Sequence, residues 1–293
     1  MANEIYNLES ENLKLQISMP DCSDFKSRFD WTGFISRIIM DGKHTFCVPD
    51  SLIEGEGTGG KGLCNEFLLN PEWYNETNEG ERFMKIGIGL LLRPDGEKYS
   101  VKRPYNDIIP FPITIDKREN YIKFIQEPLD CRGYAVKLEK TIKIAGRVIN
   151  IEYNLCNTVS RTVHTSEYCH NFFAINNKMV GSGYKLILPY SMNMDRVTDV
   201  LDINGRIIRW RWIPDMPFFF QCDDISEKEG FSWEMYHEEE GVGIREHALF
   251  DVSKFVLWGK AHVISPETYI DLLLEPGEAK SWERRYEFFY LEK

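Results

Sequence analysis

The sequence has no long hydrophobic run and no recognisable targeting segment. Its longest apolar stretches, such as residues 216–220, are far shorter than the roughly 20 residues needed to cross a bilayer. Residues 1–4 lack the basic and apolar regions of a secretory signal. These absences predict a cytoplasmic protein with no membrane partner.

Basic side chains are outnumbered by acidic ones. The 293 residues include 35 Lys and Arg against 46 Asp and Glu, which gives a formal net charge of −11. A protein that binds nucleic acid needs a positive surface to displace counterions from the phosphates. We therefore expect no nucleic-acid partner, and we expect the acidic run 238–240 to be a solvated turn.

Neither the cysteines nor the histidines form a metal-binding or disulfide pattern. The seven cysteines, at positions 22, 47, 64, 131, 156, 169 and 222, include no Cys-x-x-Cys pair, which favours reduced and mostly buried thiols. The densest group of possible ligands is His164, Glu167 and His170. On a strand, the two histidines would lie about 20 Å apart, too far to share one ion. We expect no metal and no other cofactor.

Aromatic residues, by contrast, are abundant. The chain has 18 Phe, 14 Tyr and 7 Trp, together 13% of its residues. Aromatic side chains favour strands, and their flat apolar faces also suit stacking against sugar rings. Most of them are expected to fill a core between sheets.

Apolar and polar residues alternate with a period of two along much of the chain. In residues 136–144 and 149–155 the alternation breaks only at a short glycine-containing stretch, which predicts a β-hairpin. Helical periodicity is rare, and no linker divides the chain. We therefore predict one all-β domain over residues 1–293, built from two stacked antiparallel sheets with helix in well under a fifth of the residues. Further strands are predicted at 13–18, 34–40, 86–93, 121–126, 184–188, 218–222, 231–236, 255–258, 269–274 and 281–290.

The glycine-rich segment 55–62 does not fit a phosphate-binding loop. Lys61 is followed by Gly62 rather than by Ser or Thr, and no strand–helix context surrounds it. A loop at the rim of a pocket and a plain surface loop both explain the segment. No Gly-x-Ser-x-Gly motif is present, whereas glycoside hydrolysis needs only two carboxylates and stays open.

Several short motifs occur in an order that resembles the galactose mutarotase (aldose 1-epimerase) superfamily. They are the glycine-rich loop before Asn65-Glu66, the segment 85–91, His170-Asn171-Phe172-Phe173, Ser265-Pro266-Glu267, and the closing segments 274–278, 281–282 and 285–288. The resemblance implies a β-supersandwich of two large antiparallel sheets. It also implies an isomerase that interconverts the α and β anomers of a free sugar or sugar phosphate without a cofactor. A non-catalytic carbohydrate-binding protein of the same fold, or an accessory domain of a lyase or hydrolase, is the alternative.

This resemblance implies catalytic roles for His170 and Glu267. Opening a hemiacetal ring requires one group to remove the proton of the C1 hydroxyl and another to protonate the ring oxygen, which a carboxylate and an imidazolium can do near neutral pH. We assign the acid to His170 and the base to Glu267. We expect them on opposite sides of a sugar-sized space, too far apart to bond directly. A core histidine and a surface glutamate are the alternative interpretations.

Other residues are candidates for holding the sugar. Superfamily members also have an arginine in an early loop and a second histidine; the sequence assigns no position to either, and His164 is a poor match for the histidine. The oligomeric state and the sugar are not predicted. The candidates are Asn65, Glu66, Lys85 and Arg209 for sugar hydroxyls, and Trp210 or Trp212 for stacking.

Overall fold

The protein is built almost entirely of strands. The computed structural model describes residues 5–18, 27–192, 198–226 and 230–292. Strands account for 54% of the residues and helix for 3%, which confirms the all-β prediction. Within the described ranges, no helix is long and apolar enough to span a membrane.

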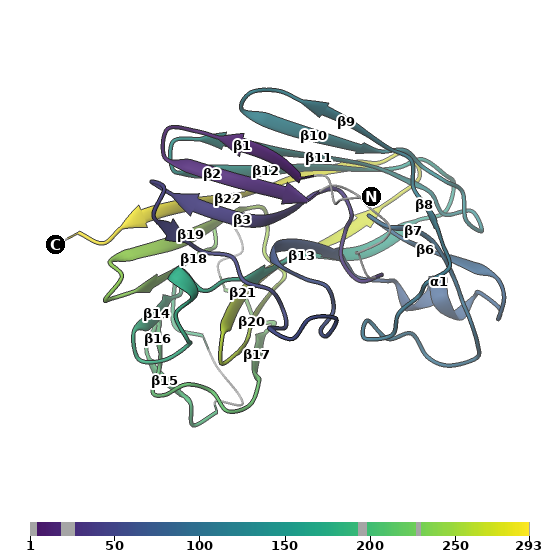
Figure 1. The fold of residues 1–293 in the computed structure, drawn as a ribbon. Helices are drawn as coiled ribbons and strands as arrows, with labels where there is room; N and C mark the ends of the chain where they lie inside the picture. The colour runs from purple at the N-terminus through teal and green to yellow at the C-terminus, as the bar shows by residue number, and fades with distance from the viewer. Residues whose placement is uncertain (1–4, 19–26, 193–197, 227–229, 293) are drawn as a thin grey trace.

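Two large antiparallel sheets, here called sheet 1 and sheet 2, form the body of the molecule (Figure 1). In the described part of the chain, sheet 1 has nine strands and sheet 2 has ten. Sheet 1 runs β1 (Ile5–Glu9), β2 (Leu13–Ser18), β3 (Phe34–Met40), β5 (Gly62–Phe67), β13 (Val163–Phe172), β21 (Val263–Leu274), β20 (Lys254–Lys260) and β17 (Phe218–Cys222), with β4 (His44–Thr45) paired to β3. Sheet 2 runs β15 (Leu201–Asn204), β16 (Ile207–Trp210), β14 (Tyr184–Ile187), β18 (Ser232–His237), β19 (Val242–Leu249), β22 (Ala279–Tyr290), β12 (Val148–Asn157), β11 (Val136–Ala145), β10 (Tyr121–Gln126) and β9 (Ile113–Lys117).

A small third sheet and two short helical segments complete the described elements. The strand predicted over 86–93 is present only over 89–92, because residues 86–88 form the turn that joins it to the preceding strand. Gly87, in the turn, has a φ of +82°, and a Cβ on it would lie only 2.7 Å from Asp30 Oδ1, so the turn requires glycine. These elements are β6 (Arg82–Lys85), β7 (Gly89–Leu92), β8 (Ile108–Pro110), helix α1 (Pro71–Asn75) and the 3₁₀ turn η1 (Ile175–Asn177).

The predicted hairpin is present as β11 and β12. Their register pairs Val136 with Asn157 at one end and Ala145 with Val148 at the other. Every second residue of β12, Ile151 among them, is buried toward sheet 1. The alternation in the sequence therefore reflects one face packed in the core and one facing solvent.

The space between the sheets holds the main hydrophobic core and a buried ionic cluster. Arg284 of β22 contacts Glu167 of β13 at 2.7 Å and Glu246 of β19 at 2.8 Å, and all three side chains are fully buried. The indole N–H groups of Trp282 and Trp233 donate to the same two carboxylates. The cluster thus ties a central strand of sheet 1 to two strands of sheet 2.

Two smaller expectations can be compared with the structure. The acidic run 238–240 forms the turn between β18 and β19. Six of the seven cysteines lie in the described ranges, where no disulfide joins them, and Cys22 lies outside those ranges.

Candidate active site

A pocket of about 560 Å³ opens on the face of sheet 1 that points away from sheet 2. Its floor is formed by three neighbouring strands, β13, β21 and β20. Successive residues of a strand face opposite sides, so Cys169 packs in the core between the sheets while His170 lines the pocket. The lining residues are Arg28, Asp50, Gly57, Thr58, Val101, Lys102, Tyr168, His170, Pro217, Phe219, Val256, Trp258, Lys260, Glu267 and Tyr269.

His170 and Glu267 lie side by side on this floor. The antiparallel register of β13 and β21 pairs Tyr168 with Tyr269 and continues unchanged beyond them, which places His170 opposite Glu267. Their side chains approach to 3.3 Å between His170 Nδ1 and Glu267 Oε1. The expectation that they stand on opposite sides of a sugar-sized space is therefore wrong, because strand pairing makes them direct neighbours.

A buried serine connects the two side chains. Ser265 Oγ lies 2.9 Å from His170 Nδ1 and 2.8 Å from Glu267 Oε1, so it is within hydrogen-bond distance of both. The backbone N–H of Asn171 donates to the same oxygen at 2.9 Å. On the far side, the Tyr269 hydroxyl donates to Glu267 Oε2 at 3.1 Å. The pair is thus held in one fixed arrangement.

Aromatic rings fix the orientation of the imidazole. The His170 ring stacks on Phe172 with 4.0 Å between ring centroids, and it meets Phe29 and Trp258 edge to face. Only Nδ1 of the imidazole is hydrogen-bonded to a residue that the structure describes. Nε2 has no hydrogen-bond partner among these described residues, and His170 lines the pocket.

Burial shifts the pKa values of the pair in opposite directions. It lowers the pKa of His170 well below its usual value, and the nearby charge of Arg28 lowers it further. It raises the pKa of Glu267 to about 8. Both shifts favour the uncharged forms, a neutral imidazole and a protonated carboxyl, over the imidazolium and carboxylate expected from the sequence.

An ionic cluster behind one wall presents Arg28 to the pocket. Arg28 donates to Glu66 Oε2 and to the Tyr168 hydroxyl, both at 2.9 Å, and Lys85 contacts Glu66 Oε1 at 3.2 Å. Burial alone would raise the pKa of Glu66, but the charges of Lys85 and Arg28 outweigh it and lower that pKa. Glu66 and Lys85, predicted to bind sugar hydroxyls, are absent from the lining, and their contacts support the arginine instead.

The glycine-rich segment contributes Gly57 and Thr58 to the lining next to Arg28, which donates to the Thr58 hydroxyl at 3.2 Å. Asp50 accepts hydrogen bonds from the Thr58 N–H at 2.6 Å and the Thr58 hydroxyl at 2.7 Å, and it pairs with Lys260 at 2.9 Å. A Cβ on Gly57 would lie 2.8 Å from Asp50 Oδ2. Of the two interpretations of this segment, a loop at the rim of a pocket is the one the structure supports.

Four other predicted binding residues lie away from the pocket. Asn65 faces the interior and donates to Glu167 Oε1 at 2.7 Å. Arg209 and Trp210 belong to β16 in sheet 2, and Trp212, an exposed residue, follows that strand. None of them is among the lining residues. Alternation along a strand indicates which residues share a face of that strand, but it does not indicate which sheet the strand joins.

The structure also adds lining residues that the sequence analysis missed. Tyr168 could have been found, since it lies two positions from His170 and therefore on the same strand face. Trp258, Lys260 and Tyr269 lie on β20 and β21, whose pairing with β13 no sequence pattern reveals. Arg28 precedes the first residues of β3 in an irregular segment that has no periodic signal.

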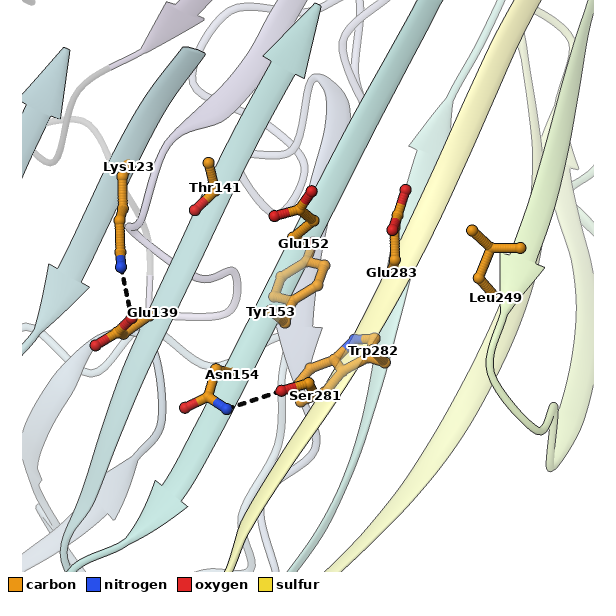
Figure 2. A pocket seen from close by; sticks show the side chains of 10 residues that line it. All are labelled: Lys123, Glu139, Thr141, Glu152, Tyr153, Asn154, Leu249, Ser281, Trp282 and Glu283. Carbon is orange, nitrogen blue, oxygen red and sulfur yellow. Dashed lines mark hydrogen bonds and ion pairs between the residues drawn. The ribbon is translucent and has the colours of Figure 1, made fainter. Parts of the chain in front are cut away.

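A second hollow, of about 430 Å³, lies on the face of sheet 2 turned away from sheet 1 (Figure 2). Three glutamates, Glu139, Glu152 and Glu283, gather there, and the first pairs with Lys123 at 2.6 Å. Partial burial and the neighbouring Glu152 raise the pKa of Glu283. The hollow is a patch of surface ion pairs, and its described lining includes no histidine that could pair with a carboxyl as His170 does with Glu267. In the described ranges, no group of three His, Cys, Asp or Glu side chains is arranged to hold a metal ion.

Comparison with known proteins identifies the architecture. No protein-family model matches the chain, and no curated protein matches its sequence. Among solved structures, a galactose mutarotase-like protein from Lactobacillus casei is 11% identical with a TM-score of 0.62, covering 98% of this chain and 100% of its own. One from Clostridium acetobutylicum is 11% identical with a TM-score of 0.61, covering 99% and 96%. An aldose epimerase homologue from C. elegans is 12% identical with a TM-score of 0.54, covering 99% and 100%. The resemblance noted in the sequence is thus confirmed at the level of the fold, and this chain has the galactose mutarotase-like fold.

Proposed function

We propose that the pocket on sheet 1 is the active site of an isomerase of the aldose 1-epimerase type, acting on a free sugar or a sugar phosphate. The observation that carries the proposal is the contact between His170 and Glu267. Two titratable groups with oppositely shifted pKa values meet on the floor of a concave pocket, an arrangement typical of acid–base sites. Proteins of the same fold that are described as aldose epimerase homologues or galactose mutarotase-like add support.

The adjacency of the two groups suits this reaction. The oxygen that loses a proton and the oxygen that gains one are both bonded to C1 of the sugar. An acid and a base that serve them should therefore be neighbours that approach C1 from one side. His170 and Glu267, 3.3 Å apart, meet that requirement, and no metal is needed to open the ring.

The walls suit a sugar and its substituents. Trp258 and Phe219 offer aromatic faces to ring carbons, and Phe219 is 56% exposed. Arg28, Lys102 and Lys260 contribute three cations to the lining. Such groups donate to hydroxyls and also to a phosphate, so both substrate classes belong in the test.

Polarimetry of freshly dissolved single anomers tests the proposal, with a panel of hexoses, pentoses and their phosphates. We expect the protein to accelerate interconversion of at least one of them. His170→Ala and Glu267→Gln should each reduce that rate by a factor on the order of 10²–10⁴. His164→Ala is the matched control, because His164 is exposed and outside the pocket lining.

The control outcome decides between the histidines. Loss of activity in His164→Ala with full activity in His170→Ala would overturn the assignment of the acid–base pair. Binding of a sugar without acceleration of its interconversion would favour a carbohydrate-binding protein instead.

A further inference from the structure

Ser265 lies between His170 and Glu267 and is within hydrogen-bond distance of both side chains. Building on the proposed function, we propose that the Ser265 hydroxyl relays a proton between Glu267 Oε1 and His170 Nδ1. Ser265 is a positioning residue in this role, since it acts through the two groups that meet the sugar.

The distances favour the path through the hydroxyl. The direct separation of 3.3 Å between His170 Nδ1 and Glu267 Oε1 lies beyond the usual range of about 2.7–3.2 Å for an N–H···O hydrogen bond. The two steps through Ser265 Oγ are 2.9 Å and 2.8 Å. Ser265 is fully buried, so water does not compete with His170 and Glu267 for its hydroxyl.

The surrounding donors define where the protons rest. Tyr269 donates to Glu267 Oε2, so the proton of the neutral carboxyl belongs on Oε1. The structure has the Ser265 hydroxyl donating to Glu267 Oε1, which is the arrangement after transfer. Before transfer, the proton on Oε1 is donated to Ser265 Oγ, and the serine hydroxyl donates to His170 Nδ1. The imidazole then carries its own proton on Nε2.

The relay moves two protons, and the total number of protons on the three side chains stays the same. The Oε1–H bond of Glu267 breaks and a new Oγ–H bond forms, while the original Oγ–H bond breaks and an Nδ1–H bond forms on His170. The neutral pair becomes an imidazolium and a carboxylate. In both arrangements Ser265 Oγ accepts one hydrogen bond from Asn171 N–H and one from a member of the pair, and it donates one, so its bonding capacity stays filled.

The relay therefore links the resting state to the reactive one. The resting pair is uncharged because it is buried, whereas ring opening uses an imidazolium as acid and a carboxylate as base. After His170 Nε2 has protonated the ring oxygen and Glu267 has taken the C1 hydroxyl proton, both groups are neutral again. The reverse transfers close the ring on either face of C1.

The kinetic test uses Ser265→Ala, with Ser265→Thr as the variant that keeps a hydroxyl. Ser36→Ala is the matched control, since Ser36 is another buried serine of sheet 1 that donates to a backbone carbonyl. We expect Ser265→Ala to reduce turnover by a factor on the order of 10². The dependence of the wild-type rate on the deuterium fraction of the solvent should be curved, as for several protons in flight, and it should become linear in Ser265→Ala. Wild-type turnover and a curved dependence in Ser265→Ala would overturn the relay.

A measurement that does not need activity separates this inference from the proposed function. In wild-type protein labelled with ¹⁵N and ¹³C, the nuclear magnetic resonance signals of His170 Nδ1 and the Glu267 carboxyl should both change at the pH where Glu267 loses its proton, because the Ser265 hydroxyl then turns from Nδ1 to Oε1. In Ser265→Ala the Nδ1 signal should no longer follow the Glu267 titration. A wild-type Nδ1 signal that stays constant while Glu267 titrates would overturn the relay, even if Ser265→Ala did not fold. Linked titration in a protein that accelerates no sugar would support the relay and refute the proposed reaction.

Discussion

The buried carboxyl of Glu267 should make the stability of the protein depend on pH in a characteristic way. In the folded state its pKa is raised to about 8 by burial, whereas an unperturbed glutamate titrates near about 4.3. Between these values the unfolded chain loses the proton while the folded protein keeps it. The folded state therefore binds more protons, and its stability must fall as pH rises through this interval.

The magnitude follows from the size of the shift. Each pH unit within the interval changes the free energy of unfolding by about 1.4 kcal/mol, so a rise from about pH 5.5 to about pH 7.5 should cost roughly 2.5 kcal/mol. Glu267→Gln has no proton to lose and lacks this dependence. The difference in free energy of unfolding between the wild type and Glu267→Gln should therefore shift by that amount in favour of the variant.

Urea unfolding followed by tryptophan fluorescence, at several pH values, measures this difference. Contributions from titrating groups that do not contact Glu267 cancel to first order because both proteins contain them. Glu239→Gln is the matched control, since Glu239 is exposed in the turn after β18, and its difference from the wild type should stay flat. A flat difference for Glu267→Gln as well would refute the claim that this carboxyl is protonated in the folded protein.

Three further predictions follow from the same contacts. Arg284→Met leaves the buried carboxylates of Glu167 and Glu246 without their cation, and urea unfolding should show a loss of roughly 3–5 kcal/mol; a loss below about 1 kcal/mol would contradict the ionic cluster. Turnover should fall as the pH rises through about 8, because Glu267 then loses the proton that the pair shares; a rate that keeps rising above that pH would count against the pair. Gly87→Ala forces a side chain into a left-handed turn and against a neighbouring carboxyl. Thermal unfolding should show that the folded state loses roughly 1–3 kcal/mol of stability, and an unchanged unfolding midpoint would contradict this prediction.

Local alternation was enough to predict most of the fold. The runs that became β11, β12 and β22 alternate because one face of each packs in the core, and this period is visible in sequence. The strand predicted over 86–93 begins too early for a different reason: residues 86–88 form a turn, and that turn depends on the close approach of Gly87 to the distant Asp30. No periodicity within the segment reports such a contact.

The site was predicted in outline but not in geometry. His170 and Glu267 were singled out by short motifs, yet their adjacency depends on the register of β13 against β21, which is set by strands far apart in the chain. Burial then lowers the pKa of His170 and raises that of Glu267, which favours the uncharged form of both groups. Arg209 was misplaced because a polar residue in an alternating run can belong to either sheet.

The measurement that tests the central claim most directly is exchange spectroscopy by nuclear magnetic resonance on sugars at anomeric equilibrium. Cross peaks between the α and β anomeric protons report interconversion even though no net change occurs. With wild-type protein we predict cross peaks that grow faster than the spontaneous background for at least one free sugar or sugar phosphate. With Glu267→Gln or His170→Ala they should return to that background. Exchange that stays at the background for every sugar in the wild type, or that persists undiminished in both variants, would contradict the assignment of this pocket as an anomer-interconverting site.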